Sequence, residues 1–510
     1  MIKTLLNRWL GGASRKGFGK RKEVPASEHG IDASLVDERA TQVVRTLQQA
    51  GYEAYIVGGA VRDLLLGLKP KDFDVATNAT PEQVKALFRR AFIIGRRFRI
   101  VHVVHGRGRE HEVIEVSTFR AVLDHSAAEA VPGNERTSKR ELAGMKHAVD
   151  ASGRVLRDNV WGPQEEDAAR RDFTVNAMYY DPQTGTVVDY HGGIQDAKRH
   201  VLRMIGDPAT RYREDPVRIL RAVRFAAKLS ARGFKLEPRT ARPLAPMRDL
   251  LADIPQSRLF DEMLKLLQTG HALASVAQLK ALGLARGIDP LLDLVVERAE
   301  TPLVQAALAD TDRRVGEGKP VAPSFLLACV LWEDVRKLWQ DRMAQGEHVM
   351  PALQTAMDDV FGQRVGDVSG RGKLAADMRE IWAMQPRFER RSGQAPFNLV
   401  EQPRFRAGFD FLRLRADARE IDDTLADWWQ EFSLADDAAR EDLVQQARAE
   451  QAPRGRAPRK SAPRSAAAPS TDTATDGGPD LEAGGEAGDG PARPRRRRRR
   501  RKPSAGGDGA

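Results

Sequence analysis

Strand patterns are confined to the first two hundred residues of this chain, and that break constrains its fold more than any other feature. Residues 55–57 form a short apolar run, and residues 98–105 and 112–119 are rich in Val, Ile and aromatic side chains, as strands are. From residue 204 onward such runs nearly vanish, and apolar residues recur at helical spacing. The sequence therefore predicts an α+β domain followed by a helical half.

Helix boundaries can be predicted on both sides of this break. The run Thr80-Pro81-Glu-Gln83 combines a cap residue, a proline at the first helical position and the glutamine of a capping box. Ser257 is expected to cap a helix in the second half. The helices predicted there include residues 257–268, 326–338 and 412–432.

The basic charge of the chain lies at its two ends. Of the net +11, residues 1–30 carry +5 and residues 451–510 carry +7, which leaves −1 for residues 31–450. The C-terminal segment has Leu481 as its one large apolar residue, so it is expected to be disordered. The unbroken run from Arg495 to Arg501 favours a polyanionic partner, either nucleic acid or an acidic membrane.

Several protein classes are excluded by composition. Cys329 is the one cysteine, which excludes a disulfide framework and a cysteine-based zinc site, and its apolar surroundings predict a buried thiol. No apolar run approaches the roughly 18 residues of a membrane span. The first ten residues lack the continuous apolar stretch of a signal peptide. We therefore expect a cytoplasmic protein without a transmembrane segment.

The first candidate site combines a glycine pair with a pair of carboxylates. Gly58-Gly59 follows a strand pattern, so backbone amides there can approach an anion closely, and Arg62 would add a phosphate contact. In the run Asp72-Phe73-Asp74 the two carboxylates point to one side, because side chains alternate along an extended segment. Such a pair is a site for hard divalent cations.

Two residues stay open as a third carboxylate. Glu115 is an acid inside the apolar run 113–116, which a buried strand tolerates only when the acid is paired or liganded. Asp172 follows Arg170 and Arg171, and its alternative role is a salt bridge to these neighbours. Spacing does not decide between the two.

These motifs resemble the class II tRNA nucleotidyltransferase and poly(A) polymerase family. The resemblance spans residues 40–270 and rests on GGAVRDLLLGLKPKDFDVAT, IEVSTFR, RRDFTVNAM, VDYHGGIQDAKRHVLRMIG and RYREDPVRILRAVRFAAKL, in the family's order. It implies a polymerase-β-type nucleotidyltransferase head, with a mixed sheet and helices, followed by an all-helical neck and body. We expect a basic N-terminal extension at 1–30, the head at 31–203, the neck at 204–270, an RNA-binding body at 271–450 and a disordered Arg-rich tail at 451–510.

The resemblance also implies roles for single residues. Asp72 and Asp74 would bind two Mg²⁺ ions, with Glu115 or Asp172 completing the catalytic set, and ATP would be the substrate. The nucleotide would contact Gly58, Gly59, Arg62, Arg171, Asn176, Asp215, Arg218, Arg221 and Arg224.

Base recognition is expected from the pair Asp215 and Arg218. Asp215 would accept a hydrogen bond from an exocyclic amine, and Arg218 would donate one to the adjacent ring nitrogen. Adenine and cytosine both offer this pattern, so the pair excludes G and U but does not separate ATP from CTP. The alternative role of Asp215 is a helix cap before Pro216.

The second half favours the bacterial poly(A) polymerase branch of the family. Its RNA-binding candidates are Arg387, Arg390, Arg391, Arg404, Arg406, Arg413 and Arg415, interleaved with Phe388, Phe405, Phe409 and Phe411. This mixture suits backbone tracking and base stacking, and the alternative is a helical pair with core phenylalanines. The arginine-rich C-terminus also resembles that branch.

The sequence thus predicts template-independent polyadenylation, in which AMP passes from ATP to RNA 3′-hydroxyl ends by a two-metal mechanism with release of pyrophosphate. The alternatives are a CCA-adding tRNA nucleotidyltransferase and a non-catalytic RNA-binding adaptor. The expected partners are RNA 3′ ends, ATP and, through the tail, RNA-decay proteins. A monomer is expected.

Deletion of residues 451–510 should weaken RNA binding most at low salt and leave ATP affinity nearly unchanged. The reason is that each neutralised phosphate adds roughly 0.7 to the log–log salt slope for single strands. The measurement is the Kd for single-stranded RNA from about 50 to 200 mM salt, with and without the segment. An equal loss of affinity at every salt concentration would contradict an electrostatic role.

Overall fold

The computed structural model describes residues 19–95, 99–106, 112–122, 129–130, 147–149, 155–158, 160–365 and 372–451. The chain separates into a compact unit at 1–452 and a second unit at 453–510. The second unit, and with it nearly all of the predicted disordered tail, lies outside the described residues.

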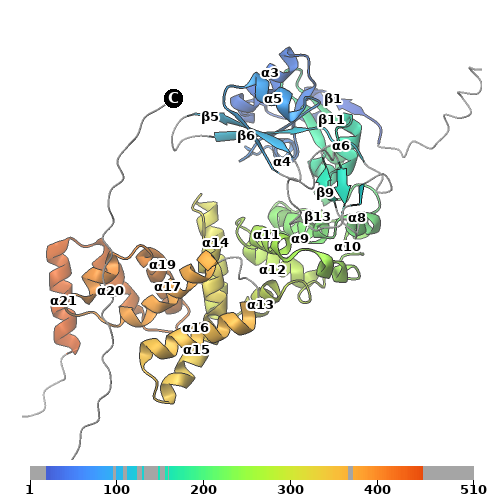
Figure 1. Ribbon diagram of the computed structural model, residues 1–510. Coiled ribbons are helices and arrows are strands. Elements are labelled where there is room, and N and C mark those ends of the chain that lie inside the picture. Colours follow the sequence, from blue (N-terminus) through green and yellow to red (C-terminus); the bar gives the residue numbers. More distant parts are fainter. Residues whose placement is uncertain are drawn as a thin grey trace, which may run out of the picture. The chain divides into compact units, whose positions relative to one another are not determined.

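The head of the compact unit alternates strands and short helices (Figure 1). Its elements are β1 (Lys22–Val24), α2 (Ala26–His29), η1 (Ala33–Leu35), α3 (Glu38–Gln49), β2 (Ala54–Val57), α4 (Gly59–Leu65), β3 (Asp74–Thr77), α5 (Pro81–Leu87), β4 (Ala91–Ile94), β5 (Ile100–His105), β6 (Glu112–Thr118), β7 (Glu129–Ala130), β8 (His147–Val149), β9 (Val155–Asp158), α6 (Gln164–Arg170), η3 (Thr174–Asn176), β10 (Met178–Asp181), β11 (Thr186–Asp189), α7 (Gly193–Lys198) and β12 (Val201–Leu202).

The rest of the described chain is helical apart from β13, which pairs with β12. Its elements are α8 (Pro208–Glu214), α9 (Val217–Ser230), β13 (Lys235–Leu236), α10 (Pro238–Ala241), η4 (Arg248–Asp253), α11 (Gln256–Leu267), α12 (Ala272–Ala281), α13 (Pro290–Arg298), α14 (Pro302–Gly316), α15 (Pro323–Ala344), α16 (Val349–Val360), η5 (Phe361–Val365), α17 (Gly372–Phe388), α18 (Ala395–Val400), α19 (Phe405–Asp417), α20 (Asp423–Leu434) and α21 (Asp437–Gln451). The predicted α+β class with a helical second half is confirmed.

An eight-stranded mixed sheet organises the head. Its strand order is β1-β11-β10-β2-β3-β6-β5-β4, and β3 and β6 are the parallel pair within it. The strand β1 pairs with β11, so the sheet begins inside the segment that the sequence assigns to the N-terminal extension. Smaller pieces β7, β8 and β9 form a separate three-stranded sheet.

The two faces of the large sheet differ in what covers them. On one face Val75, Val116 and Val101 belong to a buried cluster, which α3 and α5 cover (Figure 1). On the other face, a smaller cluster around Tyr179 includes Ala168 of α6 and covers the part of the sheet from β11 to β3. The alternation along each strand thus separates a fully covered face from one that is covered only in part.

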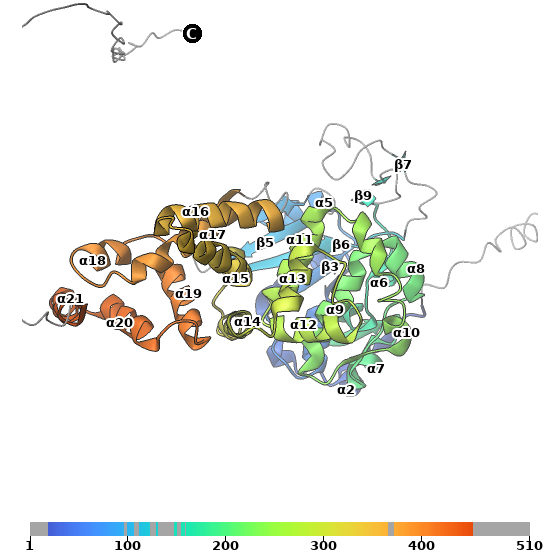
Figure 2. The same cartoon turned by 90° about the horizontal axis from the view of Figure 1, so that it is seen from below.

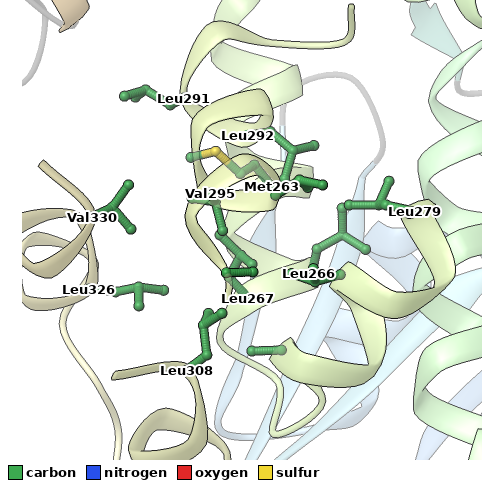
Figure 3. Packing of buried hydrophobic residues seen from close by; sticks show 14 of the residues in the cluster. Met263, Leu266, Leu267, Leu279, Leu291, Leu292, Val295, Leu308, Leu326 and Val330 are labelled. Atoms are coloured by element: carbon green, nitrogen blue, oxygen red, sulfur yellow. The ribbon is translucent and has the colours of Figure 1, made fainter. Parts of the chain in front are cut away.

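Among its described residues the helical half has two hydrophobic clusters, a smaller one that begins at Met384 in α17 and a larger core that reaches from the head to α19. Leucines and valines of α11, α13 and α15 interdigitate there, together with Leu279 of α12 and Leu308 of α14 (Figure 3). Cys329 lies in this core and is 1% exposed, which confirms the predicted buried thiol. The helices α15, α16 and α17 pack side by side (Figures 1 and 2).

Local helix predictions succeed where the capping residues are unambiguous. The capping box at α5 is confirmed: the Gln83 N–H donates to Thr80 Oγ1 at 3.3 Å, and the Thr80 N–H donates to Gln83 Oε1 at 2.8 Å. The predicted cap at Ser257 is wrong, because α11 begins at Gln256 and its N-cap position is taken by Pro255, whose ring fixes φ near −55° and whose ψ of 133° is not helical.

The single helix predicted for residues 412–432 is also wrong. Helix α19 ends at Asp417, Arg419 takes a positive φ of 59°, and α20 begins after Asp422. The Asp422 carboxylate accepts a hydrogen bond from the Thr424 N–H at 2.8 Å. This local capping bond starts a new helix within a continuous apolar pattern.

The phenylalanines predicted to stack on RNA bases lie in the protein core. Phe388, Phe405, Phe409 and Phe411 are between 0% and 8% exposed. Phe388 packs against the ring of Trp429 at 5.0 Å between centroids. The base-stacking interpretation is therefore wrong, and these rings stabilise the helical half instead.

None of the helices in the described part of the chain is long and apolar enough to cross a bilayer.

Replacement of Phe388 by Ala should destabilise the chain by about 3–5 kcal/mol, because the substitution leaves a cavity beside Trp429. Differential scanning calorimetry measures the change. Leu434→Ala is the control, because that leucine is 79% exposed and its loss should stay within about 0.5 kcal/mol. If Phe388→Ala instead left the melting temperature unchanged and weakened RNA binding, the base-stacking interpretation would be supported.

Candidate active site

One cleft of about 560 Å³ gathers most of the residues singled out from the sequence. Head residues form one wall, and residues at the start of and along α9 form another. The predicted residues that line it are Gly58, Gly59, Arg62, Asp72, Asp74, Arg171, Asp172, Asn176, Asp215, Arg218, Arg221 and Arg224. Segments far apart in the sequence thus share one polar cavity.

The carboxylates Asp72 and Asp74 both line this cleft, at the start of β3. Phe73 between them is 5% exposed and belongs to the core on the covered face of the sheet. The alternation predicted from the sequence is therefore confirmed, with two carboxylates toward the cavity and the ring behind them.

Glu115 lies directly beside Asp74, because the two residues are partners in the parallel pairing of β3 and β6. The Asp74 side chain keeps access to water, but burial by surrounding protein, followed by the charge of Glu115, raises its pKa to about 6. Arg171 opposes this shift, and Asp72 adds to it. On its other side, Glu115 Oε1 lies 3.2 Å from His102 Nε2.

The mutual repulsion of these acids fits a divalent cation. Among the described residues, no group of three or more Asp, Glu, His or Cys side chains is close enough to hold a metal ion as it stands. Asp74 nevertheless has acids on both sides that disfavour its charge. Carboxylate oxygens are the ligands that Mg²⁺ prefers, and a bound cation would relieve this repulsion.

Asp172 is committed to an ion pair instead. It is 8% exposed, and its Oδ2 accepts hydrogen bonds from Arg221 Nη2 at 2.6 Å and Nε at 2.9 Å. Its Oδ1 accepts from the Phe173 N–H. Burial opposes the charge, but the attraction of Arg221 prevails and lowers the pKa of Asp172. The salt bridge expected with Arg170 or Arg171 is thus made with an arginine of α9.

The glycine pair lies against a buried arginine. Gly58 has a φ of 78°, which favours glycine, and a Cβ on Gly59 would lie 3.4 Å from Arg62 Nη2. Arg62 is 1% exposed and donates to Asn176 Oδ1 at 2.7 Å and to Asp63 Oδ1 at 2.9 Å. The guanidinium therefore forms a fixed wall of the cleft.

Arg171 is oriented by a residue that the sequence did not single out. Asp167 Oδ2 accepts from Arg171 Nη2 at 3.1 Å and Nε at 3.2 Å, and also from the Tyr179 hydroxyl at 2.8 Å. Asp167 precedes the recognised motif by a few residues and is 7% exposed. An acid four residues before an arginine on a helix was the available signal.

The two residues expected to read the base both make contacts within the neck. Asp215 Oδ1 lies 2.9 Å from Arg258 Nη2, and Arg218 Nη1 lies 3.1 Å from Glu214 Oε2. The alternative role of Asp215 as a helix cap is wrong, because α9 begins after Pro216 without any side-chain capping bond.

The arginine stripe on α9 continues beyond the predicted residues. Arg224 forms an ion pair with Glu262 at 3.5 Å, and Lys228 follows it four residues later in the same cleft. The other lining residues that sequence reasoning missed are Ala60, Asp63, Lys71, Ser117, Arg120, Arg170 and Phe225. The sequence signal that could have predicted Lys228 is its helical spacing of three to four residues from the neighbouring arginines.

The arginines predicted to bind RNA lie outside this cleft. Four of them form ion pairs, which are Arg404–Asp377, Arg406–Asp410, Arg413–Asp427 and Arg415–Glu420. Arg406 and Arg413 line a second cleft of about 470 Å³ formed by α14, α19 and α20. The remaining candidates Arg387, Arg390 and Arg391 lie at or just beyond the end of α17.

Replacement of Asp172 by Asn should lower the stability by about 3 kcal/mol, because it breaks a buried ion pair and leaves Arg221 without its charged partner. The pKa of Asp172 is lowered in the fold, so this stabilisation is complete above the unfolded value of 3.8 and disappears as the pH falls through the folded value. Thermal melting at neutral and acid pH measures both effects.

The matched control is Glu317→Gln, which breaks the exposed pair between Glu317 and Arg313 and should leave melting unchanged. Equal effects of the two substitutions would contradict a structural role for the Asp172–Arg221 pair.

Three family models match this chain in the order of its parts. The poly A polymerase head domain matches residues 54–203. The probable RNA and SrmB-binding site of polymerase A matches 233–294, and the polymerase A arginine-rich C-terminus matches 345–465.

Curated relatives agree with these models. The poly(A) polymerase I of Salmonella typhi is 44% identical over 421 residues, which cover 80% of this chain and 85% of that protein. The CCA-adding enzyme of Geobacillus stearothermophilus is 37% identical over 247 residues, 48% of this chain and 53% of that protein. The crystal structure of the Bacillus stearothermophilus CCA-adding enzyme in complex with CTP matches with a TM-score of 0.49 and 24% identity, over 81% of this chain and 92% of that one. The chain thus belongs to the poly(A) polymerase family.

Proposed function

We propose that this chain is a template-independent poly(A) polymerase, which transfers AMP from ATP to the 3′-hydroxyl end of RNA and releases pyrophosphate. Family membership supports the class of reaction. The observation that carries the proposal is the cleft itself, in which Asp72 and Asp74 share one cavity with Asp215 and Arg218. Acids for metal ions and groups for a base thus lie within reach of one nucleotide.

The metal site is proposed to consist of Asp72, Asp74 and Glu115. Glu115 is preferred to Asp172 because it is the register partner of Asp74, whereas Asp172 Oδ2 is occupied by Arg221. Bound Mg²⁺ ions would neutralise the triphosphate and favour ionisation of the RNA 3′-hydroxyl. Asp72 and Asp74 line the cleft and Glu115 is the neighbour of Asp74 on β6, which supports a metal site at that edge of the cleft.

The phosphates of ATP are proposed to lie against the arginines of the cleft. Arg171 is held rigidly by Asp167, so little rotamer freedom is lost when it donates to an anion. Most of the rate in phosphoryl transfer comes from positioning and charge stabilisation. Arg62 and Asn176 contribute by holding the glycine pair in place, because their hydrogen bond closes the wall behind it.

The base is proposed to be read by Asp215 and Arg218. A carboxylate has about four lone-pair sites, so Asp215 can accept from the adenine amine while it keeps its ion pair with Arg258. Arg218 likewise has donors beyond the one that contacts Glu214. The same pair accepts cytosine, which keeps CCA addition as the second candidate; curated CCA-adding relatives match about half of this chain.

The experiment supplies ATP or CTP singly, with either an unstructured RNA or a tRNA that lacks its 3′ CCA. We expect long extension of the unstructured RNA with ATP and little incorporation of CTP. Extension is read on a denaturing gel. Efficient addition of CTP to the tRNA would replace the proposed function with CCA addition.

The matched control is Asp72→Asn, which keeps the side-chain volume but removes one charge from the metal site. We expect it to abolish extension while thermal melting stays near that of the wild type, since Asp72 is exposed in the cleft. Unchanged extension by this variant would contradict the metal assignment and favour a non-catalytic RNA-binding adaptor.

A further inference from the structure

One residue of every strand falls into a single row across the large sheet. The strand pairings align Glu23, Val188, Tyr179, Val57, Asp74, Glu115, His102 and Phe92. Residues directly opposite one another on paired strands point to the same face. The row therefore runs from the exposed Glu23 through the buried Val188, Tyr179 and Val57 to the two neighbouring acids, and ends at an aromatic ring at the sheet edge.

No helix or strand of the described residues covers the far end of this face. Phe92 and Ile94 on the edge strand β4 are 57% and 36% exposed, and His102 on β5 is partly exposed. The opposite face of the same strands packs under α5 (Figure 1). We call Phe92, Ile94, Ile100 and His102 the open strip.

The open strip is continuous with the cleft. Ser117 lines the cleft and is the register partner of Ile100. This pair lies two residues along the strands from the pair of Glu115 and His102. The distance from Asp74 to Phe92 spans three strand spacings, or roughly 14 Å. An occupant of the open strip can thus reach Asp74 from Phe92 by crossing only β5 and β6.

The chemistry of the open strip favours a single-stranded nucleic acid. Phe92 and Ile94 are both exposed on the edge strand β4, and an apolar sheet edge is a surface on which another chain can dock. Arg89 and Arg90 are exposed immediately before β4, so positive charge borders the aromatic ring. Aromatic rings beside basic residues bind unpaired RNA by stacking on bases and attracting phosphates.

We propose that the last nucleotides of the RNA primer cross the open strip, with a base stacked on Phe92 and the 3′-hydroxyl delivered to Asp74 and Glu115. This inference rests on the proposed function, since it supplies that function's second substrate. The nucleoside triphosphate occupies the cleft next to α9, so the primer approaches from the opposite side of the acids. The open strip thus replaces the buried phenylalanines of the body as the aromatic contact to RNA.

The test uses the full chain and a short single-stranded RNA that carries fluorescent 2-aminopurine near its 3′ end. Phe92→Ala should raise the KM for RNA roughly tenfold, since the loss of one base–aromatic stack costs about that factor in affinity. The KM for ATP and kcat at saturating RNA should not change. The fluorescence quenching seen on wild-type binding should disappear, and Phe92→Tyr should restore both the KM and the quenching.

Leu87→Ala is the matched control, because Leu87 is an exposed apolar residue (37%) of the same head, on α5 at the covered face. It should leave the KM for RNA and the quenching unchanged. Photocrosslinking of wild-type protein to a 4-thiouridine primer gives a measurement without any substitution, and crosslinks should map to β4 or β5.

The primer path would be overturned if Phe92→Ala kept the quenching and the KM for RNA of the wild type, or if the crosslinks were confined to the helical half. A protein partner would then be left as the occupant of the open strip. The quenching needs neither ATP nor catalysis, so it tests the path independently. Failure of the wild-type chain to extend any RNA would instead defeat the proposed function.

Discussion

The parallel pairing of β3 with β6 is the constraint on which the site depends. It places Asp74 beside Glu115, although the two acids repel each other and burial raises the pKa of Asp74. The pairing is held by the opposite face, where Val75 and Val116 are register partners within the buried cluster. The core on one face thus stabilises an unfavourable arrangement of charge on the other, as functional sites commonly require.

The neck completes the cleft through a second buried interaction. The ion pair of Asp172 with Arg221 joins the head to α9, and Phe173 packs against Phe225 beside it at 5.5 Å between ring centroids. This attachment turns one side of α9 toward the carboxylates and brings Asp215 into the same cavity. Some residues that the family resemblance suggested as ligands therefore also hold the walls of the cleft together. Asp172 is one of them, because its contact with Arg221 joins the head to α9.

Predictions from the sequence succeeded where a local rule determines the outcome. The capping box at Thr80 and the alternation of Asp72, Phe73 and Asp74 need only neighbouring residues, and both are confirmed. The wrong predictions concern sequence patterns that are compatible with two different local structures. Ser257 and Pro255 compete to start one helix, and the body phenylalanines have the same spacing whether they face a core or a ligand. Only the packing of other helices decides between such solutions.

The sequence by itself determined the fold class, the family and the set of chemical groups, because these depend on the order and spacing of residues along the chain. The tertiary structure decided which of these groups can contact a metal ion or a substrate. Glu115 rather than Asp172 borders Asp74, Arg62 is enclosed as a wall, and Phe92 is left exposed at the sheet edge. Strand register and ion-pair partners come from distant segments, and burial follows from how all segments pack, so no local pattern contains this information.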